Sequence, residues 1–326
     1  MPAGRRRRGL VPGRVEGGGR FGTVRRGTWL ILAGAVLWGT TGTAQALAPA
    51  GATPAVIGAL RLAVGAAGLL VVAAAPPDLA RLRGWPVLPT VLAAAGVAAY
   101  QLAFFAGVAA TGVAVGTMAA IGSSPVFAGL LAWLVRGERP APRWYPSTAL
   151  AVTGAALLAL SAGQVEADVV GILLALGAGA AYAAYAVASK NVLDTRGPDA
   201  AMAVIFSGAA LLLAPLLPGA DLSWALSPRG AGVILHLGLI TIAVAYRLYA
   251  QGLTTVPVST AVTLSLAEPL TAALLGIAVL GERPTVTELL GIALLLAGLV
   301  VLAEVKPSWL TAWSRGGSWS KRAPSP

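Results

Sequence analysis

The sequence predicts an all-α integral membrane protein whose ten transmembrane helices form two inverted five-helix repeats. Three observations predict this fold: the composition, the recurrence of long apolar stretches, and a block of sequence that occurs twice. Hydrophobic residues make up 57% of the 326 residues and charged residues 11%, whereas soluble proteins carry about 25% charged residues. So few charges cannot cover the surface of a soluble enzyme of this length, so that class is excluded.

Ten apolar stretches make up most of the chain, separated by short breaks of glycine, proline and charged residues. Each is apolar nearly all round, which lipid and neighbouring helices together require. The first could instead be a secretory signal. Its length of about 21 residues exceeds the usual apolar core of about 7–15 residues, so we expect an uncleaved helix. The predicted spans are 28–48, 54–75, 86–108, 112–135, 144–162, 169–190, 199–217, 230–250, 257–280 and 285–303.

Positive charges are distributed unevenly between the two sides of this predicted bundle. With the N-terminus in the cytoplasm, 20 of the 23 Lys and Arg residues fall on the inner side, which predicts that both termini are cytoplasmic. Residues 1–27 and 304–326 are then basic cytoplasmic tails of a multi-pass protein of the cell membrane. No surface of mixed basic and aromatic residues follows the N-terminal arginines, which indicates contact with the lipid bilayer and argues against nucleic acid as a partner.

A block of 16 residues occurs twice in the chain. The segment Pro125–Pro140 reads PVFAGLLAWLVRGERP and Pro269–Pro284 reads PLTAALLGIAVLGERP, with nine identical positions at an offset of 144. Composition bias explains shared alanines and leucines, but it does not explain one register held without gaps across five spans. The same offset pairs Pro54 with Pro198, Ala106 with Ala250, Thr111 with Thr255, Gly154 with Gly298, and Trp38 with Tyr182.

This duplication predicts two units of five helices each, at residues 28–163 and 169–303. Because five is odd, the second unit must be inserted upside down relative to the first. Inverted repeats recur in secondary transporters, in which two similar halves exchange conformations and open a central site to either side. The alternative is a duplication kept only as a packing solution.

The paired motif resembles a known family. The spacing Pro-x11-Gly-Glu-Arg at the ends of the fourth and ninth spans, together with Trp38-Gly39, Arg61 and Glu268-Pro269, resembles the EamA-type transporters of the drug/metabolite transporter superfamily. The resemblance covers roughly residues 28–303. It implies a ten-helix transporter that exports amino acids or other small metabolites. The first half departs from symmetry, because Ser124 stands where the second half has Glu268.

Two charged residues fall within predicted spans, where a charge costs about 2.5–3.5 kcal/mol on insertion scales. Glu268 lies midway along the ninth span and Arg61 lies within the second. We expect Glu268 to be a proton-coupling or cation-contacting carboxylate in a hydrated cavity, and Arg61 to bind a substrate carboxylate through paired hydrogen bonds. The alternative is a structural ion pair between the two.

The duplicated prolines predict two symmetry-related kinks. Pro125 and Pro269 each free the carbonyl of the residue four positions earlier, at Ile121 and Ser265. In a membrane such carbonyls need partners in protein or beside a hydrated cavity. We expect both kinks to face a central substrate site, with the alternative that they only shape the bundle. The hydroxyls predicted to line this site belong to Ser123, Ser124 and Ser265.

Aromatic and amide side chains away from the membrane interfaces are further candidates for substrate binding. Trp38, Tyr182 and Tyr185 fall near the middle of their spans, and Tyr100 and Gln101 fall in the outer part of the third. Ring faces could hold a substrate amine or apolar group. Ordinary packing is the alternative for each of them, and the offset that pairs Trp38 with Tyr182 favours the functional interpretation.

Several other polar features do not indicate chemistry. Glu138-Arg139 and Glu282-Arg283 fall at span ends on opposite faces of the membrane, so we interpret them as turn residues. His236 has no metal ligand at suitable spacing and the chain has no cysteine, so we expect neither a metal site nor a disulfide. No phosphate-binding loop is present, and we expect no cofactor.

These observations favour a secondary active transporter of a small-molecule substrate, acting as a monomer or homodimer by alternating access. Proton coupling through Glu268 is one option, and import rather than export by the same fold is another. The competing class is an intramembrane enzyme. Gly122-Ser123 with His236 is the only trace of such a site, and neither a catalytic partner nor a nucleophile turn accompanies it.

Overall fold

The computed structural model describes residues 17–74, 84–161, 168–281 and 283–303, and the regular structure in these ranges is entirely helical. The all-α prediction is therefore confirmed. In chain order the elements are α1 (Gly17–Gly39), α2 (Thr41–Ala46), α3 (Pro54–Ala74), α4 (Val87–Arg136), α5 (Trp144–Ser161), α6 (Val169–Leu193), α7 (Pro198–Leu213), η2 (Ala214–Leu216), α8 (Ser223–Leu226), α9 (Pro228–Leu235), the π-helical η3 (His236–Val244), α10 (Ala245–Leu253), α11 (Val258–Leu264), α12 (Ala267–Leu280) and α13 (Val286–Ala303).

Eight helical segments in the described ranges are long and apolar enough to cross a membrane. The long helix α4 contributes two of them, because Gly112 interrupts it with φ 78° and ψ 163°, a conformation that side-chain-bearing residues rarely adopt. Such a chain is a multi-pass membrane protein. The eight segments are 54–74, 87–112, 115–136, 169–193, 198–216, 228–253, 258–279 and 286–303.

The spans predicted at 28–48 and 144–162 correspond to α1 and α5, which are not among these eight segments. Both are less apolar than their neighbours, since α1 carries Arg25 and Arg26 in its sequence and α5 begins Trp-Tyr-Pro-Ser-Thr. Helix α1 starts at Gly17, inside the predicted tail 1–27. The remainder of that tail and the tail 304–326 lie outside the described residues.

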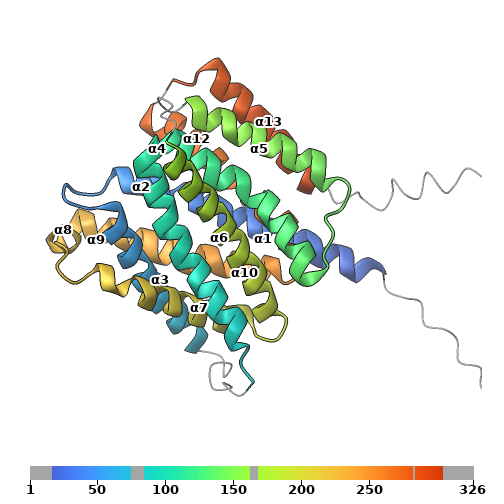
Figure 1. Cartoon of the computed structure of the whole chain (residues 1–326), viewed down its shortest axis with the longest axis horizontal. Helices are drawn as coiled ribbons and strands as arrows, with labels where there is room; N and C mark the ends of the chain where they lie inside the picture. Colours follow the sequence, from blue (N-terminus) through green and yellow to red (C-terminus); the bar gives the residue numbers. More distant parts are fainter. Residues whose placement is uncertain (1–16, 75–83, 162–167, 282, 304–326) are drawn as a thin grey trace, which may run out of the picture.

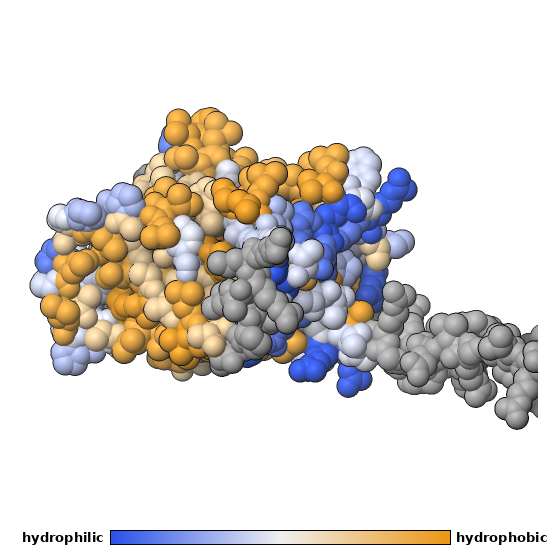
Figure 2. Space-filling view, turned by 90° about the horizontal axis from the view of Figure 1, so that it is seen from below, coloured by the Kyte–Doolittle hydropathy of each residue, from blue (hydrophilic) through white to orange (hydrophobic). Residues whose placement is uncertain are grey.

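The outer surface of the bundle is largely apolar. Large hydrophobic side chains stand exposed on several helices, among them Val71 at 75%, Leu88 at 69% and Val286 at 84%. Figure 2 shows hydrophobic residues spread over much of one face, with hydrophilic residues gathered toward one end of it. An apolar surface this extensive would be unstable in water and fits the hydrocarbon core of a bilayer.

Small residues let the helices approach closely. Helices α5 and α13 pack against each other at one edge of the bundle, and α3 packs against α7 at another (Figure 1). A methyl group on Gly154 of α5 would lie 2.6 Å from the carbonyl oxygen of Gly291, and one on Gly298 of α13 would lie 2.6 Å from that of Ser147. These two contacts correspond at the offset of 144 residues. Backbone contact through small residues is how helices associate in lipid, where no hydrophobic effect drives them together.

Adding a single methyl group at this contact should destabilise the protein. We expect Gly154→Ala and Gly298→Ala each to lower the free energy of unfolding by about 1–3 kcal/mol, as overpacking does. Gly177→Ala is the control, because nothing lies within 4 Å of its Cβ position and alanine favours the helix. Thermal unfolding of the detergent-purified variants measures this, and equal stability of all three would contradict the close contact.

Candidate functional site

A cavity of about 590 Å³ lies within the bundle and is lined from both halves of the chain. Its volume falls in the range of about 300–1,000 Å³ that is usual for small-molecule sites. The π-helical segment η3 contributes Thr241 and Ile242 to its wall, and such segments occur frequently at functional sites. The sequence-predicted residues that line it are Trp38, Arg61, Tyr100, Gln101, Ser124, Tyr182, Ser265, Glu268 and Pro269.

Three of the residues predicted for the site do not line this cavity. Pro125 is buried inside α4, and Ser123 donates to the carbonyl oxygen of Ala120 on its own helix at 3.3 Å. Tyr185 is 1% exposed and its hydroxyl donates to the sulfur of Met202 at 3.6 Å, which makes it a core residue behind Tyr182. The geometry therefore brings most, but not all, of the predicted residues together around one space.

Arg61 and Glu268 line the same cavity without forming an ion pair. Ion pairs at 4.0 Å or less form elsewhere in the described ranges, among them Arg136–Glu138, Arg136–Asp194 and Arg247–Asp199, and none joins Arg61 to Glu268. The structural pair Arg61–Glu268, which the sequence left open, is therefore not formed in this conformation. Opposite charges held apart beside a cavity can each bind a complementary group of a ligand, or a proton in the case of the carboxylate.

Gln101 holds the Arg61 guanidinium in place. Arg61 Nη2 donates to Gln101 Oε1 at 2.8 Å, which joins α3 to α4. Gln101 is 3% exposed, yet its Nε2 and the Nε of Arg61 are buried without a hydrogen-bond partner in the structure. Unpaired buried donors are costly. One of these donors is charged and the other neutral, and an anionic group such as a carboxylate is a suitable acceptor for both kinds.

The two duplicated prolines give different local structures. Around Pro125 helix α4 continues, and the freed carbonyl oxygen of Ile121 accepts a hydrogen bond from the hydroxyl of Ser124 at 2.8 Å. Before Pro269 the helix is interrupted, since α11 ends at Leu264 and α12 begins at Ala267. There the carbonyl oxygen of Ser265 accepts from the backbone N–H of Glu268 at 2.9 Å. This tight turn fixes the position of the only carboxylate in the middle of the ninth predicted span.

An aromatic cluster forms one wall of the cavity. The Tyr182 hydroxyl lies 3.1 Å from Ser265 Oγ, and its ring centroid lies 5.8 Å from that of Tyr100. The Trp38 ring lies 4.6 Å from Tyr246, and Trp38 Nε1 donates to the carbonyl oxygen of Thr241 at 2.9 Å. Tyr246 was missed by the sequence analysis because it precedes Arg247, near a predicted span end. The helical spacing of Tyr246 and Tyr249 was the available signal.

The Gly-Glu-Arg-Pro segments end helices, as the sequence predicts. Gly137 closes α4 with φ 67° and Gly281 closes α12 with φ 72°, both in the left-handed conformation usual after a helix C-terminus. His236 Nε2 lies 2.9 Å from Thr40 Oγ1, a polar packing contact. In the part of the chain that the structure describes, no group of three or more His, Asp or Glu side chains could hold a metal ion.

Comparison with known proteins identifies relatives that are transporters. The EamA-like transporter family matches residues 25–160 and again residues 169–303. An uncharacterized transporter of Bacillus subtilis, YwfM, is 48% identical over 282 residues, covering 86% of this chain and 95% of that protein. The threonine/homoserine exporter RhtA of Escherichia coli is 31% identical over 273 residues, covering 82% and 88%. A solved structure with 21% identity superposes with a TM-score of 0.74, covering 89% of this chain and 98% of the other, and shares the fold.

The carbonyl that Pro125 frees within α4 yields a test of the local chemistry. Ser124→Ala removes the hydroxyl that satisfies the freed carbonyl of Ile121, and an unsatisfied buried group costs about 1–3 kcal/mol. Ser123→Ala is the matched control. Ser123 donates to the carbonyl of Ala120, and that carbonyl does not depend on the hydroxyl, because the residue four positions later, Ser124, keeps its backbone N–H. We expect Ser124→Ala to lower the thermal stability in detergent clearly more than Ser123→Ala does. Equal losses would show that the hydroxyl of Ser124 does not satisfy that carbonyl.

Proposed function

This chain belongs to the EamA-like transporter family, and from that premise we propose that it is a secondary active transporter that exports amino acids or other small metabolites. The family and the relatives are transporters, so the chain is not an enzyme. The observation that carries the proposal is that two side chains of opposite charge, Arg61 and Glu268, line a cavity of about 590 Å³ without forming an ion pair with each other. Export rather than import follows the relative named as an exporter.

The proposed architecture has ten transmembrane helices in two inverted repeats, at residues 28–163 and 169–303. Helices α1 and α5 bring the first set to five, and the second set has five apolar segments of its own. Contacts at corresponding positions support this, since a methyl group on Gly252 would lie 2.5 Å from the carbonyl oxygen of Gly27, and one on Gly107 3.0 Å from that of Gly171. These pairs correspond to within one residue at the offset of 144. Inverted repeats of this kind permit alternating access.

The proposed orientation puts both termini in the cytoplasm of a cell-membrane protein. In that orientation the cavity reaches the external side, because its lining includes Gln45 of α2, Pro54 at the start of α3, and Glu288 of α13. The conformation would then be open to the outside. Whether the protein is a monomer or a homodimer, and which ion is coupled to transport, stay predictions. In each case a small-molecule substrate crosses the bilayer.

Within this proposal, the cavity binds a molecule that carries a carboxylate and a cationic group. Arg61 and Gln101 present N–H donors to the carboxylate, and the rings of Tyr100, Tyr182 and Trp38 offer faces to a cation or an apolar group. Glu268 accepts either the cationic group or a proton. An amino acid meets both requirements, which agrees with the name of the Escherichia coli relative.

Neutralising Glu268 tests proton coupling. We expect Glu268→Gln to lose the stimulation of transport by an imposed pH gradient, because an amide cannot carry a proton, while exchange of substrate across the membrane persists. Glu288→Gln is the matched control, since that carboxylate also borders the cavity but accepts from the backbone N–H of Thr285 at 2.7 Å as a helix cap. Uptake into inside-out vesicles across a range of pH gradients measures it. An unchanged gradient dependence in Glu268→Gln would remove the proton role.

Removing the N–H donors of Arg61 and Gln101 tests whether they bind a substrate carboxylate. We expect Arg61→Met and Gln101→Leu each to reduce transport of an amino acid by roughly 10- to 100-fold, because hydrogen bonds to charged groups contribute about 1.5–3 kcal/mol. The amide of the same amino acid, which lacks the carboxylate, should be transported equally by the wild type and both variants. The control is Arg229→Met, because Arg229 only contacts the exposed carbonyl of Leu47. A screen that compares a deletion strain with its complemented parent selects the amino acid, and equal loss for acid and amide would contradict the assignment.

A further inference from the structure

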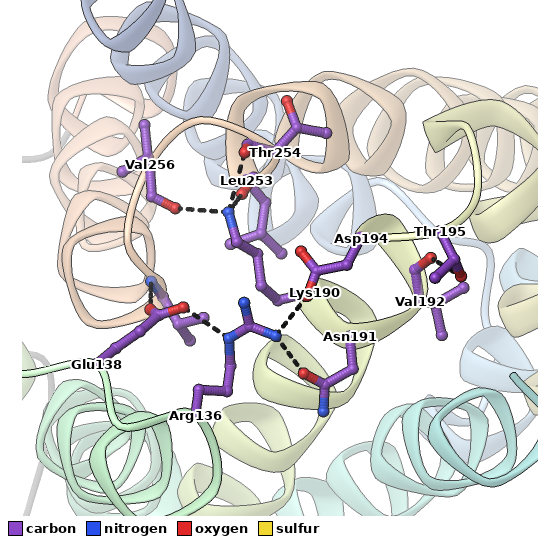
Figure 3. A network of polar contacts seen from close by, with 11 residues as sticks. Arg136, Glu138, Lys190, Asn191, Val192, Asp194, Thr195, Leu253, Thr254 and Val256 are labelled. Carbon is purple, nitrogen blue, oxygen red and sulfur yellow. Dashed lines mark hydrogen bonds and ion pairs between the residues drawn. The ribbon is translucent and has the colours of Figure 1, made fainter.

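One end of the bundle is held together by a dense polar network (Figure 3). Arg136, the last residue of α4, donates from Nε to Glu138 at 2.6 Å and from Nη1 to Asp194 at 2.8 Å and to Asn191. Asn191 belongs to α6, and Asp194 is the residue directly after the end of that helix. The side chain of Arg136 is 15% exposed, so these bonds are partly shielded from water. They join the end of the fourth span to the end of the sixth.

Lys190 extends this network to a third helix. It lies in the last turn of α6, is 8% exposed, and donates from Nζ to the carbonyl oxygens of Leu253, of Thr254 at 3.1 Å and of Val256 at 3.4 Å. The last carbonyls of a helix have no intrahelical partner, and a cation there is stabilising. Lys190 therefore ties the C-terminus of α10 to α6.

Glu138 links the network to α11, because its Oε2 accepts from the backbone N–H of Val258, the first residue of that helix, at 3.3 Å. The network thus binds α4, from the first half of the chain, to three helices of the second half. Helices α4 and α11 also belong to the cavity wall, through Ser124 and Val262. Separating the two halves at this end would break the bonds of Arg136 to Asn191 and Asp194 and the bond of Glu138 to Val258, whereas the bonds of Lys190 join two helices of the second half.

Among the residues that the structure describes, the opposite end has no corresponding group of ion pairs. At the offset of 144 residues, Arg136 corresponds to Leu280, Lys190 to Ala46, and Asp194 to Ala50, none of which can form an ion pair, while Glu138 corresponds to Glu282, which lies outside the described residues. A further ion pair, Arg247–Asp199, joins α10 to the first turn of α7. Because that turn follows α6 after a short connection, this pair also belongs to the network end.

The cavity is shut at the network end. Its lining includes Gln45 of α2 and Pro54 at the start of α3, both near the opposite end of the bundle, and none of the residues Arg136, Glu138, Lys190 or Asp194. We propose that this network, defined by those four residues and Asn191, is a one-sided polar lock. It seals the cavity at its own end, breaks when the cavity opens there, and biases the transporter toward the state open at the opposite end. The bias arises because Leu280, Ala46 and Ala50, the counterparts of Arg136, Lys190 and Asp194, have no polar side chain that could form such bonds.

The lock can be tested without knowing the substrate. The chain has no cysteine, so a single introduced thiol is the only one present. Ser259→Cys places it on α11 at a position that is 3% exposed and next to the residue bound by Glu138. Thr117→Cys places it in the cavity wall toward the open end. The rate of modification by a membrane-impermeant maleimide is measured from each side, in right-side-out and inside-out vesicles.

We expect Arg136→Met to raise the modification rate of the Ser259→Cys variant from the network side about tenfold, and to lower that of the Thr117→Cys variant from the opposite side, because the bonds of Arg136 to Asn191 and Asp194 join the two halves. Glu138→Gln is the second lock variant, since it keeps the size of the side chain and serves if Arg136→Met does not fold. Arg139→Met is the matched control, because it removes a positive charge from an exposed neighbour. Monodisperse elution in detergent establishes that each variant is folded.

Unchanged rates in both lock variants, or the same change in Arg139→Met, would overturn the lock. A rise in modification from both sides would overturn it as well, because that is the result of a loosened bundle rather than a shifted equilibrium. If only the proposed orientation were wrong, the two thiols would exchange the side from which they are reached, and the dependence on Arg136 and Glu138 would remain.

Discussion

Polar groups inside a membrane protein must find partners within the protein, and this constraint governs both the fold and the site. The carbonyl freed by Pro125 is satisfied by the hydroxyl of Ser124, and the one before Pro269 by the N–H of Glu268. Lys190 satisfies the carbonyls at the end of α10. Against this background the groups that lack partners are informative. Nε of Arg61 and Nε2 of Gln101 are buried and unpaired, and both residues line the cavity.

The two halves of the chain share a framework and differ in chemistry. Corresponding glycines, such as Gly154 and Gly298, make corresponding backbone contacts. Several polar residues do not correspond, since Glu268 has Ser124 as its counterpart and Arg136, Lys190 and Asp194 have Leu280, Ala46 and Ala50. In the proposed alternating-access cycle, a symmetric framework provides two states of similar energy. The asymmetric polar residues then determine what binds and which state is favoured, because a few hydrogen bonds shift a two-state equilibrium substantially.

Much of this was predictable from the sequence, because the features concerned are local or periodic. Apolar length predicts the helices, and Gly137 and Gly281 mark helix ends through a conformation that glycine favours. The duplicated prolines indicated where carbonyls would be freed. The partners of long-range contacts were not predictable, since pairs such as Lys190 with Leu253, or Trp38 with Thr241, depend on how distant helices are rotated. For the same reason the failure of Arg61 and Glu268 to pair could not be foreseen, whereas Tyr246 was missed because it lies near a predicted span end.

The central claim is that the cavity is the substrate site of a carrier, and counterflow in proteoliposomes tests it most directly. Vesicles containing the purified protein are preloaded with an unlabelled amino acid and diluted into a trace of the same compound in labelled form. The account predicts that label accumulates transiently inside preloaded vesicles, and not inside empty vesicles or vesicles without protein. Equal entry of label with and without preloading, for every amino acid and small metabolite tried, would contradict it.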